Sequence, residues 1–145
     1  MAEFSHNRLF NSNNPYQGEN KKVLCVCSAG LLRSPTTAHV LTKEFGYNTR
    51  AAGIDAGHAL IPVDVVLLHW ADEIVCMDEN QKLAIIAEMD KFEGKNAHLN
   101  INLHETPIYV LNVPDMFARM DDKLQSIILD NYMDVHPDFN KRREI

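Results

Sequence analysis

The chain has 145 residues, 46% of them hydrophobic and 23% charged, and a formal net charge of -6. This length suits one domain with its own core, and no apolar run approaches the roughly 20 residues of a membrane span. The negative charge argues against a general nucleic-acid binder, which normally has a basic face. Three cysteines are too few for a disulfide framework. We therefore expect a cytoplasmic protein with neither a nucleic acid nor a membrane as its partner.

The sequence divides into an N-terminal arm, residues 1–21, and a single domain, residues 22–145. The arm is rich in Asn and Ser and shows no sustained periodicity. Leu9, Phe10 and Tyr16 are the side chains through which it would pack. The basic segment at the C-terminus, HPDFNKRREI, is predicted to be a frayed, solvated end.

Short apolar runs alternate with segments of helical spacing in the rest of the chain. The predicted strands are residues 23–27, 49–54, 73–77 and 108–111, and the predicted helices follow them, one including residues 63–70. This alternation is typical of βαβ units, so we expect an α/β fold of three layers, with a four-stranded parallel sheet between helices.

Five residues mark the expected helix ends. Ser34 is predicted to cap the first helix and Gly46 to end it. Asp78 and Gln81 have the spacing of a capping box, and Asp121 is a candidate cap for the last helix.

The segment between the first strand and the first helix carries the strongest functional signal. Cys27 ends the strand, and Arg33 and Ser34 follow with the spacing Cys-x5-Arg-Ser, directly before Pro35. In parallel α/β sheets, ligands bind at the carboxyl ends of the strands. A thiol and an arginine beside a helix N-terminus at that edge predict a phosphate site.

Each residue of this segment has a predicted role. Cys27 is the candidate nucleophile, which attacks phosphorus and forms a phosphocysteine; the helix N-terminus and Arg33 favour its thiolate form. The guanidinium of Arg33 matches two phosphate oxygens, and Ser34 is placed to donate to the sulfur. The predicted phosphate-binding residues are Ser28, Ala29, Gly30, Leu31, Leu32, Arg33 and Ser34, with Phe117 as a substrate contact.

The reaction also needs a general acid and base. The seven histidines are scattered without metal-ligand spacing and are predicted to lie at the surface. Asp115 follows the fourth strand and should reach the same edge of the sheet as Cys27, so it is the preferred candidate. Asp121 and Asp122 are the alternatives. No metal or cofactor is required by this scheme.

These motifs resemble the low-molecular-weight protein tyrosine phosphatase family. The strand–Cys-x5-Arg-Ser-Pro–helix unit, the AAGI segment, the WADEIVCMDEN stretch and the late VPD loop occur in the family's order, over residues 22–132. The resemblance is strongest to short, divergent members. It implies hydrolysis of phosphotyrosine, in a protein or a small aryl phosphate, with Cys27, Arg33 and Asp115 as nucleophile, phosphate clamp and general acid.

Three features depart from the family pattern. Ala29 and Gly30 stand where the family usually has Gly-Asn, so the asparagine side chain that braces the loop is absent; Gly30 still permits a left-handed backbone. Leu32 replaces a second loop cysteine, which removes the family's protective disulfide. The family's Asp-Pro order is reversed around Asp115, and Phe117 is the ring that would grip a phosphotyrosine.

Three other interpretations compete with this one. An arsenate reductase-like enzyme would need further thiols, but Cys25 and Cys76 are predicted to be core residues within strands; phosphocarrier domains would not need Arg33. The other alternative is a catalytically inactive module that binds phosphoproteins.

Overall fold

The computed structural model describes residues 20–28, 33–54, 62–95, 103–114, 116, 118 and 120–139. Its four strands are β1 (Lys22–Cys27), β2 (Asn48–Gly53), β3 (Glu73–Cys76) and β4 (Ile108–Val110). They form one sheet in the order β2-β1-β3-β4, and every neighbouring pair is parallel. The predicted four-stranded parallel sheet is therefore confirmed, with strand ends within two residues of the expected ones.

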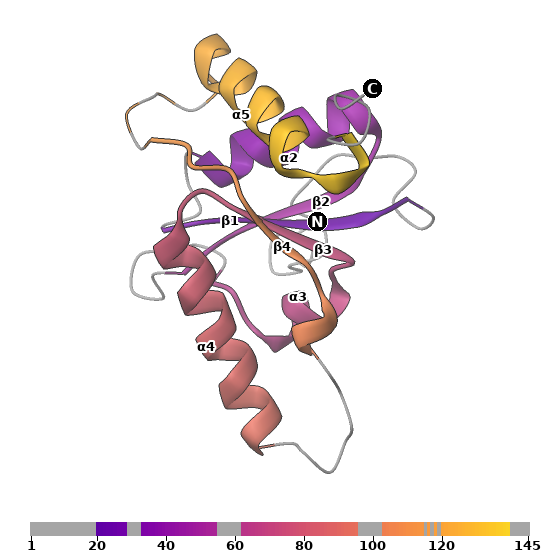
Figure 1. Cartoon of the computed structure of the whole chain (residues 1–145), viewed down its shortest axis with the longest axis vertical. Coiled ribbons are helices and arrows are strands. Elements are labelled where there is room, and N and C mark those ends of the chain that lie inside the picture. Colours follow the sequence, from indigo (N-terminus) through magenta and orange to yellow (C-terminus); the bar gives the residue numbers. More distant parts are fainter. Residues whose placement is uncertain are drawn as a thin grey trace, which may run out of the picture.

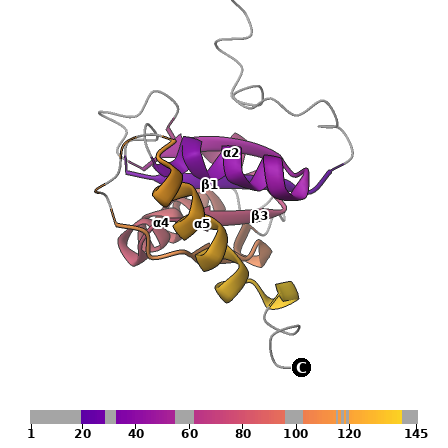
Figure 2. The same ribbon diagram turned by 90° about the horizontal axis from the view of Figure 1, so that it is seen from above.

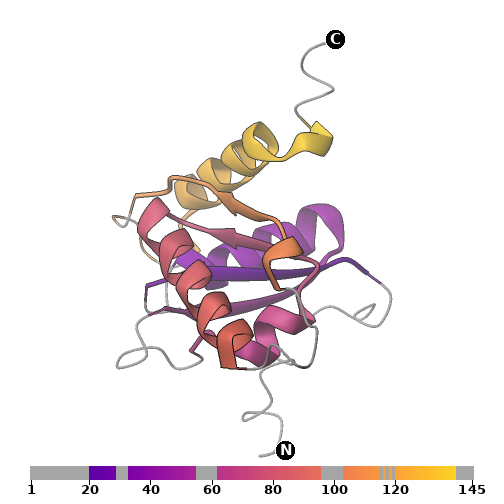
Figure 3. The same cartoon turned by 60° about the horizontal axis from the view of Figure 1, so that its bottom comes forward.

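Helices cover both faces of the sheet, as Figure 1 shows. Helix α2 (Arg33–Phe45) and helix α5 (Asp122–Val135) lie on one face, which Figure 2 shows from above. Helix α3 (Val65–Trp70) and helix α4 (Glu79–Lys95) lie on the other, which comes forward in Figure 3. A short 3-10 helix, η3 (Leu103–Glu105), precedes β4. The three-layer α/β architecture follows the prediction.

The side chains of β1 alternate between two hydrophobic cores. Val23 and Cys25 belong to the core beneath α2 and α5, whereas Leu24 and Val26 belong to the core beneath α3 and α4. All four are fully buried. Because neighbouring residues of a strand face opposite sides of the sheet, a strand covered by helices on both sides must be apolar throughout. This packing holds β1 in place up to its last residue, Cys27, after which the loop begins.

Strand β2 forms despite an arginine in its centre. Arg50 is buried and donates to the side chain of Asn48 (2.8 Å) and to the carbonyl of Thr49 (2.7 Å), and its guanidinium lies over the ring of Trp70 (5.0 Å to the centroid). Burial lowers the pKa of Arg50 to about 10. These contacts compensate for the burial of its charge within the strand.

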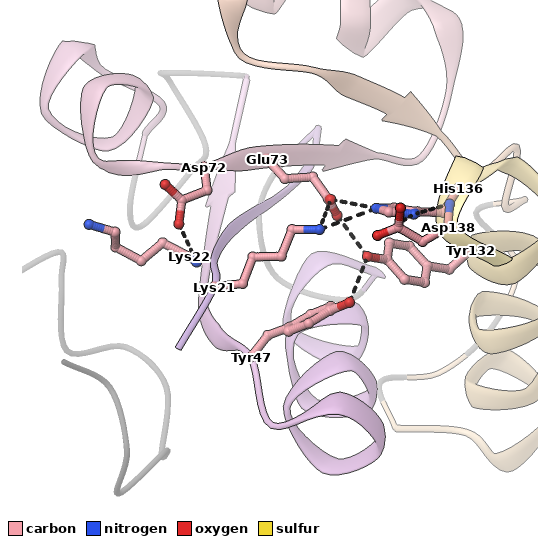
Figure 4. Close-up of polar contacts among 8 residues, drawn as sticks. All are labelled: Lys21, Lys22, Tyr47, Asp72, Glu73, Tyr132, His136 and Asp138. Carbon is pink, nitrogen blue, oxygen red and sulfur yellow. Dashed lines mark hydrogen bonds and ion pairs between the residues drawn. The ribbon is translucent and has the colours of Figure 1, made fainter. Parts of the chain in front are cut away.

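Residues 136–139 correct the prediction of a frayed end for the first part of the C-terminal segment, and residues 140–145 lie outside the described part of the chain. His136 is buried, and Phe139 packs against the core beneath α2 and α5. Figure 4 shows the polar cluster that holds it: the carboxylate of Glu73 contacts His136 (2.7 Å), Lys21 and the hydroxyl of Tyr132 (2.8 Å). Glu73 begins β3, so this cluster lies at the amino ends of the strands.

No helix among the described residues is long and apolar enough to cross a membrane.

Candidate active site

The sulfur of Cys27 lies at the carboxyl end of β1, beside the first turn of α2. Its thiol donates to the hydroxyl of Ser34 (3.2 Å), and that hydroxyl donates to the backbone carbonyl of Ala52 in β2 (3.3 Å). Cys27 is only 4% exposed and Ser34 is fully buried. Helix α2 begins at Arg33, so Ser34 lies within the first turn, and its predicted role as the helix cap is wrong. Its hydroxyl accepts a hydrogen bond from the thiol instead.

Arg33 is fixed at the same end of α2 by a backbone contact. Its Nη1 donates to the carbonyl of Val113 (2.9 Å), which follows β4, and lies 3.8 Å from a carboxylate oxygen of Asp78. The residue is 6% exposed. An arginine held this way has lost most of its rotamer freedom before any ligand binds, which reduces the entropy cost of an anion contact.

A cleft of about 540 Å³ opens beside these residues. It is lined by Ser28, Arg33, Met77, Asp78, Asn112, Val113 and Pro114. These residues come from the carboxyl ends of β1, β3 and β4 and from the start of α2. The cleft therefore lies at the edge of the sheet where α/β proteins bind their ligands. Asn112 has a left-handed backbone (φ 55°), which turns the chain after β4 toward this cleft.

The turn between β3 and α4 forms one wall of the cleft. The backbone N–H of Gln81 donates to Asp78 Oδ1 (3.0 Å), and Gln81 Oε1 accepts from the backbone N–H groups of Met77 (2.7 Å) and Asp78 (3.3 Å). The predicted capping box is confirmed. Gln81 Nε2 also reaches Ser28 Oγ (3.4 Å), which the sequence did not reveal, because only the pairing of β1 with β3 brings the two segments together.

Several predicted site residues lie outside the described part of the chain: Ala29, Gly30, Leu31, Leu32, Asp115 and Phe117. The residues that flank Asp115 are described on both sides. Pro114 lines the cleft, and Met120 donates its backbone N–H to Thr36 Oγ1 in the first turn of α2 (3.0 Å). Pro114, which precedes Asp115, and Met120, which follows it, thus both lie near the first turn of α2.

The two alternative acids have other surroundings. Asp121 accepts from the backbone N–H of Lys123 (2.8 Å) and caps α5, as predicted. Asp122 lines a separate groove with Lys43 of α2 and Gln125 of α5. Neither residue lines the cleft beside Cys27.

The other two cysteines belong to the cores, as expected. Cys25 and Cys76 are fully buried, and no disulfide joins the three cysteines. Burial raises the pKa of Cys76 to about 12 and raises that of Cys25 well above its ordinary value. Among the described residues, no group of His, Cys, Asp and Glu side chains forms a metal site. The prediction that histidines lie at the surface fails for His136, which is buried.

The chain matches no protein-family model and no curated protein in sequence. Solved structures do match its fold. Wzb from Vibrio vulnificus, in complex with benzylphosphonate, is 18% identical and matches with a TM-score of 0.53 over 77% of this chain and 91% of its own. The tyrosine phosphatase Wzb from Escherichia coli, in complex with phosphate, is 14% identical, with a TM-score of 0.55 over 77% and 93%.

A third structure matches over a larger share of this chain. The tyrosine phosphatase AmsI from Erwinia amylovora is 12% identical and has a TM-score of 0.53 over 82% of this chain and 93% of its own. The chain therefore has the fold of the low-molecular-weight tyrosine phosphatases, which agrees with the resemblance found in the sequence. At these identities the likeness concerns the fold alone.

Proposed function

We propose that this protein is a cysteine-dependent phosphomonoester hydrolase that acts on phosphotyrosine. The observation that carries the proposal is the arrangement of Cys27, Ser34 and Arg33: a sulfur 3.2 Å from a hydroxyl, at the start of the helix whose first residue, Arg33, lines the cleft and is held in place by Val113. A nucleophile, a group that stabilises it as a leaving group and a fixed cation are the parts that phosphoryl transfer through sulfur requires.

The first step forms the phosphocysteine. The thiolate of Cys27 attacks phosphorus, a sulfur–phosphorus bond forms, and the bond between phosphorus and the ester oxygen breaks. Asp115 protonates the departing oxygen, and Arg33 neutralises charge on the transferred group. In the second step, water attacks the phosphocysteine and gives a proton to Asp115. The sulfur–phosphorus bond breaks, and the hydroxyl of Ser34 donates to the thiolate that leaves.

The role of Asp115 is supported by its neighbours in the chain. Pro114 lines the cleft, and the backbone of Met120 donates to Thr36, so described residues before and after Asp115 lie near the first turn of α2. Asp121 is engaged as the cap of α5. Asp115 is therefore the better candidate for the general acid and base.

The preference for an aryl phosphate rests on two supports. The proteins that share the fold include two described as tyrosine phosphatases and one bound to benzylphosphonate, an aromatic phosphonate. In this chain, Phe117 is the aromatic residue nearest to Asp115 in sequence, and it would grip the ring. The backbone N–H groups of residues 28–34 and the guanidinium of Arg33 would bind the phosphate.

The arsenate reductase-like reading has little support. Its chemistry needs thiols that attack an intermediate formed on Cys27, and the two other cysteines are fully buried with raised pKa values. A buried neutral thiol is a poor nucleophile. The inactive phosphoprotein-binding module remains the alternative to exclude by experiment.

Hydrolysis of p-nitrophenyl phosphate in the presence of EDTA tests the proposal. We expect turnover that EDTA does not change and that Cys27→Ser abolishes. Turnover that survives Cys27→Ser would exclude the mechanism. Binding of a phosphotyrosine peptide without any turnover by the unaltered protein would instead identify a binding module. A panel of phosphotyrosine, phosphoserine and phosphothreonine peptides then tests the substrate class.

A further inference from the structure

Gln81 has an amide group whose orientation is determined by its backbone partners. The residue lies in the first turn of α4 and is 3% exposed. Its Oε1 accepts from the N–H groups of Met77 and Asp78. Since both partners are donors, the oxygen of the amide must face them, and Nε2 must point the other way. The fold therefore determines which way the oxygen and the nitrogen of the Gln81 amide point.

The nitrogen of this amide points at the start of the loop that follows β1. Gln81 Nε2 donates to the hydroxyl of Ser28 at 3.4 Å. Ser28 is the residue directly after Cys27, and it lines the cleft together with Arg33 and Asp78. A buried side chain of α4 thus contacts the first residue of the loop that follows β1.

This contact determines how the hydroxyl of Ser28 is used. A serine hydroxyl has one proton to donate and can accept two hydrogen bonds. Gln81 offers only protons from its Nε2, so the oxygen of Ser28 acts as the acceptor in this pair. The proton of the hydroxyl is then directed to another acceptor, and Ser28 is exposed in the cleft. An anion in the cleft is the acceptor that such a donor suits.

We propose that Gln81 is a positioning residue that orients the Ser28 hydroxyl as an additional hydrogen-bond donor to the phosphate group in the cleft. This inference rests on the proposed function, because it assigns a further phosphate contact at the same site. The contact between Gln81 and Ser28 can also support the start of the loop. In this chain, Ala29 and Gly30 stand where the family usually has Gly-Asn, whose asparagine braces the loop. This contact comes from the β3–α4 turn, which lies outside the loop.

Three variants separate the polar contact from the helix cap. Ser28→Ala removes the hydroxyl. Gln81→Glu keeps oxygens that accept from Met77 and Asp78, but it offers Ser28 an acceptor, so the hydroxyl donates to residue 81 and no longer into the cleft. Asn80→Asp is the matched control, since it adds the same charge at the same helix turn from an exposed position that does not contact Ser28.

The probe is inorganic phosphate, with its dissociation constant measured by calorimetry and its inhibition constant from p-nitrophenyl phosphate turnover. We expect Ser28→Ala to weaken phosphate binding about tenfold, the effect of one hydrogen bond to a charged group. Gln81→Glu should weaken it more than Asn80→Asp does. In the Ser28→Ala background, Gln81→Glu should have no more effect than Asn80→Asp, which a double-mutant cycle measures. Melting temperatures check that each variant folds.

The inference is overturned if Ser28→Ala binds phosphate as tightly as the unaltered chain. It is also overturned if Gln81→Glu weakens binding equally in both backgrounds, because its effect would then be one of charge or folding. Failure of the proposed function looks different: phosphate binds and responds to the variants, but no ester is hydrolysed. A chain that binds no phosphate at all would refute both.

Discussion

The sulfur of Cys27 and the hydroxyl oxygen of Ser34 lie 3.2 Å apart, and both are shielded from solvent. In the thiol form the hydroxyl accepts from the sulfur and donates to Ala52. When the sulfur is a thiolate, the same hydroxyl can turn and donate to it. One side chain therefore serves both protonation states, and its contribution is largest where negative charge returns to the sulfur.

The first prediction concerns Ser34→Ala. Without the hydroxyl, thiolate departure from the phosphocysteine should slow, because a hydrogen bond to a charged group contributes about 1.5–3 kcal/mol. We expect kcat to fall about 10–100-fold and a burst of p-nitrophenol to precede slow turnover, as rapid-mixing absorbance would record. Thr37→Val is the control, because the hydroxyl of Thr37 donates to the Arg33 carbonyl in the same helix (2.7 Å). An unchanged kcat without a burst would contradict the role of Ser34.

The second prediction concerns Arg33→Lys. An ammonium group is a point charge with three donors in a tetrahedral arrangement, whereas the guanidinium is a planar fork of donors. The ammonium group cannot face two phosphate oxygens side by side as the guanidinium does while it also keeps the contact with Val113. We expect kcat/KM to fall about 100-fold, the equivalent of one charge-assisted hydrogen bond. Arg50→Lys changes another buried arginine, in β2. It should lower stability and leave kcat/KM unchanged; equal losses in the two variants would show a general effect on folding.

The third prediction separates the three thiols. Cys25 and Cys76 are fully buried and their pKa values are raised, that of Cys76 to about 12. Near neutral pH they should be protonated and unreactive. Iodoacetamide should therefore modify Cys27 first, and inorganic phosphate should slow the reaction. Peptide mass spectrometry identifies the site. Modification of Cys76 at the same rate, or a rate that phosphate does not change, would argue against the proposed nucleophile.

The regular part of the fold could be predicted because its signals are local. The apolar run before Cys27, the turn glycine Gly46 (φ 71°) and the capping box of Asp78 and Gln81 each depend on neighbouring residues. All are found where the sequence placed them. The edge of the sheet that carries Cys27 followed from the alternation of strands and helices.

Contacts between distant segments could not be predicted in the same way. The strand over residues 49–54 was predicted, but the contact of the Arg50 guanidinium with the ring of Trp70 was not. His136 looked like part of a solvated tail, although it is buried against Glu73. The link between Gln81 and Ser28 likewise exists only because β1 pairs with β3. In each case a polar residue contacts a partner that only the tertiary fold brings to it.

The fourth prediction concerns the pH dependence of the stability that a histidine of η3 contributes through its contacts with α4. His104 contacts Glu93 through Nδ1 (2.8 Å) and Asp90 through Nε2 (2.7 Å). The hydrogen bond to Glu93, and then that to Asp90, raise the pKa of His104 from 6.5. Because the folded pKa is the higher one, the stabilisation is fully present below pH 6.5 and is lost as pH rises through the folded value.

His104→Gln should therefore lower the melting temperature more at about pH 5.5 than at about pH 9. His69→Gln, on the exposed surface of α3, is the control that measures the effect of losing an exposed imidazole at each pH, and the comparison is made relative to it. A larger loss of melting temperature in His104→Gln at the higher pH would contradict a stabilising contact that depends on the imidazolium.

The last prediction concerns the buried carboxylate at the opposite end of the sheet from Cys27. Glu73 is 1% exposed and is bound by Lys21, His136 and the hydroxyl of Tyr132 (Figure 4). Tyr132→Phe removes one of these donors and leaves a buried charge with fewer partners. That should cost about 1–3 kcal/mol of unfolding free energy. Tyr47→Phe removes the longer contact to Tyr132 (3.4 Å) and leaves the hydroxyl of Tyr132 on Glu73, so it should cost less.

Urea unfolding of the two variants measures this difference, with unchanged m-values as the sign that the unfolding reaction is the same. Because the cluster joins β3 to the end of α5 and lies away from the cleft, neither variant should alter kcat/KM for p-nitrophenyl phosphate below the unfolding transition. A loss of kcat/KM in Tyr132→Phe alone, at full folding, would mean that the C-terminal segment affects the site through the sheet. Equal destabilisation by both variants would mean that ring packing, rather than the hydroxyl on Glu73, is what Tyr132 contributes.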